Sequence, residues 1–61
     1  MDIAILDTST GQVDIMRNVD EDFISVVYAD DVPAYLADHG YNVDYIQFMC
    51  HDSIKVNEII L

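Results

Sequence analysis

Two short segments near the N-terminus have the apolar pattern of β-strands. Residues 3–6 form a continuous apolar run, and residues 13–17 alternate between apolar and polar side chains. Between them, residues 8–12 are rich in Thr, Ser and Gly, which favour turns. The pattern therefore predicts a β-hairpin at the start of the chain.

The next segment combines a polar stretch with an ambiguous apolar one. Residues 18–22 are polar and acidic, and we expect a loop there. Residues 23–28 are apolar and rich in β-branched side chains, so they fit either a third strand or the first turns of a helix. The sequence leaves both alternatives open.

From residue 29 the apolar spacing becomes helical. Asp30 or Asp31 can cap the helix N-terminus, and Pro33 is tolerated in the first turn. Gly40 suits the left-handed residue that ends a helix, and the apolar Tyr41 after it can pack back on the helix. The face expected to point to the core is formed by Val32, Tyr35 and Leu36.

The C-terminal third predicts two further strands. Residues 45–50 read as a strand with Ile46, Phe48 and Cys50 on one side and Tyr45, Gln47 and Met49 on the other. Residues 51–53 read as a turn. Residues 54–61 begin by alternating and end in three apolar residues. This arrangement predicts a second hairpin.

These elements predict an α+β fold in which two β-hairpins flank one helix, in the order ββαββ. We expect an antiparallel four-stranded sheet with the helix across one face. Residues 1–61 are expected to form a single domain, because so short a chain cannot bury two cores. One helix cannot cover both faces of a sheet. Apolar residues on the far face, and Ile59 to Leu61, are therefore either tolerated surface or an interface.

The composition supports a soluble domain inside the cell. Apolar residues make up 52% of the chain, enough for a packed core, yet no run approaches the roughly 20 residues that span a membrane. The N-terminus lacks the basic region of a secretory signal, so we expect a cytoplasmic protein. Cys50 is the only cysteine and cannot form an intrachain disulfide. A domain this small is expected to be marginally stable, and a homodimer would supply further burial.

Charge is the strongest compositional feature. The net charge is −10 at pH 7, and residues 20–44 contribute seven acidic residues and no basic one. Such a surface repels phosphate backbones and anionic lipids, so we expect neither direct nucleic-acid binding nor membrane binding. The expected partner is a basic protein surface. The alternative is that the acidic residues only keep a small apolar domain soluble.

No catalytic, metal or cofactor site is predicted. Cys50 and His51 are neighbours on a predicted strand and point to opposite faces, so they cannot easily share a metal ion. Cys50 is expected to be a small buried hydrophobe. A nucleophile pair of Cys50 and His39 would need an orienting group and a deep pocket. Residues 20–22 lack the ligand spacing of a calcium loop, and the turn at residues 8–11 has no lysine or following helix to bind phosphate.

The remaining candidates form a protein-binding surface. Tyrosine offers contact area with a polar tip, and aspartate attracts lysine or arginine on a partner. The residues expected to contact the partner are Asp20, Glu21, Asp22, Asp30, Asp31, Tyr35, Asp38 and Tyr45. We therefore expect a non-enzymatic protein-interaction module. In the alternative function, short aspartates imitate a run of phosphates, and the chain is a nucleic-acid mimic that inhibits a nuclease, a repressor or a defence protein.

The order of motifs resembles that of short acidic proteins of uncharacterised function from bacterial mobile elements and phages. The similarity lies in the apolar start with its Ser-Thr-Gly turn (residues 3–11), in the helix end Tyr-Leu-Ala-Asp-His-Gly-Tyr (residues 35–41), and in the strand at residues 46–49. Residues 23–28 look like an insertion relative to those proteins. The resemblance implies an accessory protein of a phage or mobile element, without a catalytic residue or ligand.

Overall fold

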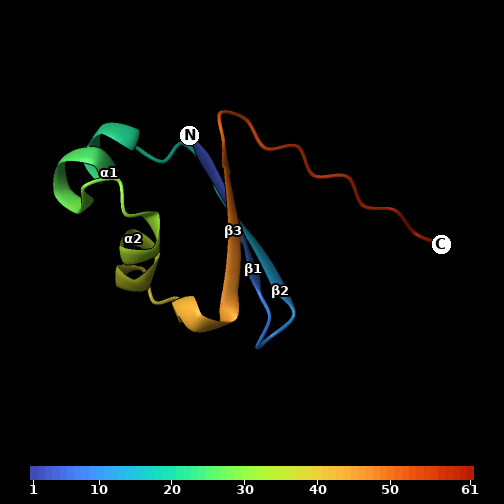
Figure 1. Ribbon diagram of the computed structural model, residues 1–61. Coiled ribbons are helices and arrows are strands. Elements are labelled where there is room, and N and C mark those ends of the chain that lie inside the picture. Colours follow the sequence, from blue (N-terminus) through green and yellow to red (C-terminus); the bar gives the residue numbers. More distant parts are fainter.

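A computed structural model describes residues 1–61 and shows a three-stranded sheet with two helices on one side (Figure 1). The elements follow one another as β1 (Asp2–Asp7), β2 (Gln12–Met16), α1 (Glu21–Tyr28), α2 (Val32–Asp38), the 3-10 helix η1 (Val43–Tyr45) and β3 (Ile46–His51). The α+β class and the antiparallel sheet agree with the sequence. The predicted ββαββ order is wrong, because the order is ββααηβ.

The predicted N-terminal hairpin is confirmed. β1 and β2 pair antiparallel, with Ile3 opposite Met16 and Asp7 opposite Gln12. The Asp7 carboxylate accepts hydrogen bonds from the backbone N–H and the hydroxyl of Ser9, at 2.9 and 2.6 Å, and so holds the turn. Gly11 adopts a positive φ of 73°, which glycine tolerates without strain.

β3 pairs with β1 and not with the residues that follow it. The sheet order is β2-β1-β3, and β3 runs antiparallel to β1. The predicted strand is thereby confirmed, although Tyr45 belongs to η1 instead. Ile46, Phe48 and Cys50 share one face of β3, as expected, because Ile5 and Ile3 lie opposite Phe48 and Cys50.

Residues 23–28 form helix α1, which resolves the alternative that the sequence left open. Asp20 caps this helix, since its carboxylate accepts hydrogen bonds from the N–H groups of Asp22 and Phe23. The predicted loop at residues 18–22 is therefore shorter than expected, and its last two residues are already helical. Ile24 points inward and is 2% exposed, so its burial helps to stabilise α1 against the sheet.

Helix α2 confirms the predicted signals at both ends. The Asp31 carboxylate accepts a hydrogen bond from the N–H of Ala34, and Pro33 lies in the first turn. Gly40 adopts a φ of 92°, and the N–H of Tyr41 then returns to the carbonyl of Leu36 at 3.1 Å. This is the helix ending expected from glycine followed by an apolar residue.

The core lies between the helices and one face of the sheet. Ile3, Ile5 and Leu36 are completely buried, so β1 and α2 form its centre. The remaining members of the cluster are Val19, Ile24 and Tyr35. The opposite face of the sheet carries no helix. We call this surface the open face; the side chains that point to it from the strands include Ala4, Leu6, Val13, Ile15, Gln47 and Met49.

The last part of the chain is not a strand, so the predicted second hairpin is wrong. Residues 52–61 have no regular secondary structure. After Ile54 the chain extends away from the sheet (Figure 1). The Cα radius of gyration of 12.3 Å exceeds the value of about 10–11 Å typical of a compact chain of this length, consistent with the extended segment. The outer edge of β3 stays unpaired, because the N–H of Ile54 donates to the carboxylate of Asp2 and the following residues make no backbone hydrogen bond.

Neither α1 nor α2 is long and apolar enough to cross a membrane.

Candidate functional site

Helix α1 exposes an apolar surface that the core does not use. Phe23, Val26 and Val27 are 47%, 84% and 58% exposed. They are spaced three and four residues apart, which puts them on one side of a helix. Ile24 and Tyr28 occupy the inward side of the same helix. We call Phe23, Val26 and Val27 the α1 patch.

Aromatic packing fixes Phe23 in place. Its ring meets Tyr28 and Tyr35 in edge-on contacts, with centroids 6.0 and 6.5 Å apart. Tyr28 and Tyr35 contact each other at 5.5 Å. Tyr35 also contacts the ring of His39 at 4.2 Å. This cluster joins α1 to α2, so the α1 patch rests on a packed support.

The part of the chain that forms the two helices carries many acidic residues and no basic one. Residues 20–41 contain six acidic residues and neither lysine nor arginine. Three of the six have structural partners: Asp20 and Asp31 cap helices, and Asp38 accepts a hydrogen bond of 2.8 Å from the hydroxyl of Tyr28. The side chains of the other three, Glu21, Asp22 and Asp30, make no hydrogen bond or ion pair within the chain.

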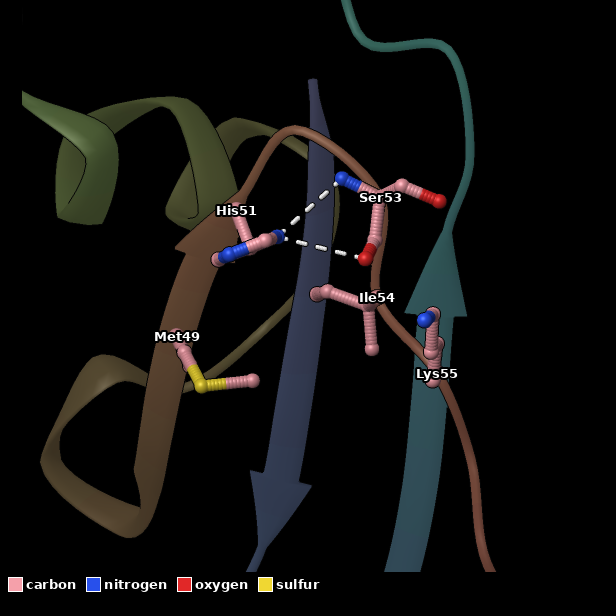
Figure 2. A pocket seen from close by; sticks show the side chains of 5 residues that line it. All are labelled: Met49, His51, Ser53, Ile54 and Lys55. Atoms are coloured by element: carbon pink, nitrogen blue, oxygen red, sulfur yellow. Dashed lines mark hydrogen bonds between the residues drawn. The ribbon is translucent and has the colours of Figure 1, made fainter.

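The basic side chains lie on the other side of the molecule. Arg17 forms an ion pair of 2.8 Å with Asp2 at the end of the sheet. Lys55 lies beside β2, after the chain has crossed the sheet (Figure 2). The layer formed by α1, α2 and η1, here named the helical layer, therefore contains acidic residues and neither lysine nor arginine.

A hollow of about 200 Å³ separates the start of α1 from the sheet. It is lined by Met1, Glu21, Ile24, Asp30, Val32 and Cys50. Burial, and to a lesser degree the charge of Glu21, raises the pKa of the Cys50 thiol. A raised pKa leaves the thiol protonated at neutral pH, which opposes a nucleophilic role. Cys50 is nonetheless exposed, so the expectation of a buried side chain is wrong.

The residue types considered for chemistry are not assembled into a site. Nδ1 of His39 lies 2.8 Å from the carbonyl oxygen of Tyr35, which requires the proton on Nδ1 because a carbonyl can only accept. His39 does not line the hollow that contains Cys50. Nδ1 of His51 contacts the backbone of Ser53. No three His, Cys, Asp or Glu side chains converge where a metal ion could bind.

The structure separates the eight residues predicted for partner binding into two sets of acidic residues and two tyrosines in different places. Glu21, Asp22 and Asp30 are exposed beside α1, and Asp20, Asp31 and Asp38 are exposed but also hold local structure. Tyr35 is only 9% exposed and supports the α1 patch from beneath. Tyr45 is 55% exposed, but it lies in η1, at the other end of the helical layer from α1 (Figure 1).

Sequence reasoning missed the α1 patch itself. Its signal was present, because Asp20 precedes two acidic residues, as at many helix N-termini, and Phe23, Val26 and Val27 then follow at helical spacing. The β-branched valines obscured this signal, since they are also typical of strands.

Comparisons with protein-family models, with curated proteins and with solved structures found no match.

Proposed function

We propose that this chain is a non-enzymatic protein-interaction module whose helical layer binds a basic surface on another protein. The observation that carries the proposal is the α1 patch, an exposed apolar surface next to acidic side chains that have no partner within the chain. Phe23 and Val26 supply the centre of this surface, and Asp22 lies on the turn before Val26.

This arrangement matches the anatomy of a protein interface, which has an apolar centre and a polar rim. Phe23 is the expected anchor, because aromatic side chains dominate binding energy and its ring is held by Tyr28 and Tyr35. An eight-residue helix is only about 12 Å long. A stable interface therefore extends beyond α1, over the acidic residues of the α1–α2 junction.

The charge of the layer selects the partner. Glu21, Asp22 and Asp30 are available for lysine or arginine on the other protein. Long-range attraction between the net charge of −10 and a basic surface speeds the encounter, while direct binding to nucleic acid or to an anionic membrane is opposed. The predicted partner is consequently a basic protein with an apolar groove or pocket.

A nucleic-acid mimic is the second candidate, and one observation favours it. The six acidic residues at positions 20–41 form a surface without any basic residue, as a phosphate backbone does. The α1 patch favours the first candidate, because a run of phosphates has no counterpart to the exposed Phe23 and Val26.

Affinity capture with matched variants tests the proposal. The immobilised chain is exposed to a nuclease-treated bacterial lysate at low and high salt, beside a Val26→Ser variant and an Asp22→Asn/Asp30→Asn variant. We expect the wild-type chain to retain a basic protein that neither variant retains. With this partner purified, each variant is expected to bind it with a dissociation constant at least about tenfold higher than that of the wild type. Val56→Ser is the control, because Val56 is similarly exposed (65%) but lies far from the helices in sequence and fold.

One outcome would contradict the proposal, and a competition experiment separates the two candidates. A partner whose binding survives the charge variant unchanged contradicts the proposed acidic interface. If the captured protein binds nucleic acid, competition decides between module and mimic: a mimic is displaced by nucleic acid from the same groove and loses affinity steeply with salt. Simultaneous binding of the chain and nucleic acid excludes the mimic.

A further inference from the structure

The open face of the sheet is mostly apolar, and only the chain around Ile54 covers it, at one end. Leu6, Val13 and Met49 point to it and are 45%, 60% and 54% exposed. Two hollows lie along it on either side of Met49, with volumes of about 320 and 300 Å³. The first is lined by Ala4, Leu6, Gln47, Phe48 and Met49. The second, shown in Figure 2, is lined by Met49, His51, Ser53, Ile54 and Lys55.

An anchor at Ile54 brings the chain across the upper end of this face. Ile54 is only 5% exposed, and its N–H donates a hydrogen bond of 3.1 Å to the carboxylate of Asp2. Nη1 of Arg17 binds the same carboxylate and also donates to the carbonyl of Ile54 at 2.6 Å. Figure 2 shows the chain passing from β3 over β1 to β2. The point at which residues 55–61 leave the sheet is thus fixed.

Residues 55–61, here named the C-terminal segment, contact almost nothing in their own chain. They take part in no hydrogen bond, and Val56, Ile59 and Ile60 are 65%, 73% and 87% exposed. In an extended conformation Val56, Glu58 and Ile60 point to one side and Lys55, Asn57, Ile59 and Leu61 to the other, so each side carries two apolar side chains. Apolar side chains on both sides are typical of a strand that is covered on both faces.

The open face and the C-terminal segment each have a net charge close to zero, although the protein as a whole is acidic. Asp2 and Arg17 neutralise each other at the edge of the face. Within the C-terminal segment, Lys55 balances Glu58. Two copies with a net charge of −10 repel each other through their helical layers, so they can approach most closely with the open faces together.

We propose that the protein forms a symmetric dimer in which the C-terminal segment of each copy lies on the open face of the other copy, between the two sheets. Seven extended residues span about 23 Å, which matches the length of about 20 Å of the six-residue strand β1. A segment folded back on its own sheet would cover only one of its two apolar sides. The position between two sheets covers both, and each segment's isoleucines meet the hollows beside Met49.

The oligomeric state tests this inference directly. Sedimentation equilibrium of the full chain over micromolar to millimolar concentrations is expected to show a monomer–dimer equilibrium that tightens as salt screens the acidic charge. Ile59→Asp/Ile60→Asp in the C-terminal segment and Met49→Asp on the open face each weaken the dimer about tenfold or more. Val26→Asp is the control on α1 and leaves the dimer unchanged. Circular dichroism establishes that each variant folds.

A mixing experiment identifies the contact. The Ile59→Asp/Ile60→Asp variant keeps an intact open face, and the Met49→Asp variant keeps an intact C-terminal segment. Each variant alone dimerises weakly because both of its reciprocal contacts are impaired, whereas a mixture retains one intact contact and is expected to form a heterodimer more tightly than either variant forms a homodimer. If the sheets associated face to face without the segments, the mixture would gain nothing over the separate variants.

Three results overturn the inference. The first is a wild-type chain that remains monomeric at millimolar concentration and high salt. The second is a dimer that the substitutions in the C-terminal segment leave intact. The third is protection of the amides of residues 55–61 from hydrogen exchange in the monomer, which would show that the segment folds back on its own sheet. None of these results bears on the basic partner of the helical layer, whose binding weakens with salt.

Discussion

The hydroxyl of Tyr41 donates a hydrogen bond of 2.6 Å to Oδ2 of Asp14, and so joins the residue that closes α2 to the edge strand β2. The two residues are 27 positions apart in the sequence. The carboxylate of Asp14 raises the pKa of Tyr41 to about 12, and the Tyr41 hydroxyl is the main reason why the pKa of Asp14 lies below its usual value. This contact ties the helical layer to the hairpin.

Replacing the acceptor is expected to change the alkaline titration. In Asp14→Asn the charged acceptor is gone, so the pKa of Tyr41 falls from about 12 toward 10. Because folding raises this pKa, the stability that the hydrogen bond provides is complete below pH 10 and is lost as the pH rises through about 12. Ultraviolet titration of tyrosinate measures the change. Asp38→Asn is the control, because it affects Tyr28 and leaves Tyr41 unchanged.

Acid is expected to destabilise the fold through three hydrogen-bonded carboxylates. The pKa of Asp2 is lowered mainly by the N–H of Ile54, that of Asp7 by the Ser9 hydroxyl, and that of Asp14 by Tyr41. Lowered values mean that their stabilisation is present above the ordinary pKa of 3.8 and is lost as the pH falls below it. Urea unfolding between about pH 5 and about pH 2 measures this loss. A free energy of unfolding that stays constant over this range would contradict the assignment.

Two substitutions of Asp20 distinguish the effect of its capping hydrogen bonds on the stability of α1 from the effect of its negative charge. Asp20→Ala removes the acceptor for the first N–H groups of α1 and is expected to cost about 0.5–2 kcal/mol, whereas Asp20→Asn keeps the cap and costs little. Thermal unfolding followed by circular dichroism compares the two. Glu21→Ala is the matched control, since Glu21 caps nothing. Equal losses in the alanine and asparagine variants would show that the charge, and not the cap, matters.

The junction between α1 and α2 is strained at Ala29, which adopts a left-handed conformation with φ 52° and ψ 43°. Left-handed geometry is unfavourable for alanine and free of this cost for glycine. Ala29→Gly is therefore expected to stabilise the protein by about 1 kcal/mol. Ala37→Gly, inside α2, has the opposite sign and costs about 1 kcal/mol. The midpoint of denaturant unfolding is measured for both variants. If the two midpoints shift in the same direction, Ala29 is not strained by its left-handed conformation.

Local signals in the sequence determined the N-terminal hairpin, helix α2 and the strand β3. The turn at residues 8–11, the cap at Asp31 and the ending at Gly40 each act within a few residues, so the chain specifies them without distant partners. The excess of acidic residues in the middle of the chain is likewise a property of the sequence, and the fold only gathers it on the helical layer.

Tertiary structure decided what depends on distant partners. Residues 23–28 form a helix because Asp20 caps its N-terminus and Ile24 is buried in the core. Their β-branched side chains would also suit a strand. Residues 54–61 have a strand-like pattern, but they pair with neither edge strand, β2 or β3. The N–H and carbonyl of Ile54 are bonded instead to the side chains of Asp2 and Arg17. A residue pattern states which side chains are able to pair or to be buried; only the folded chain determines whether a partner lies within reach.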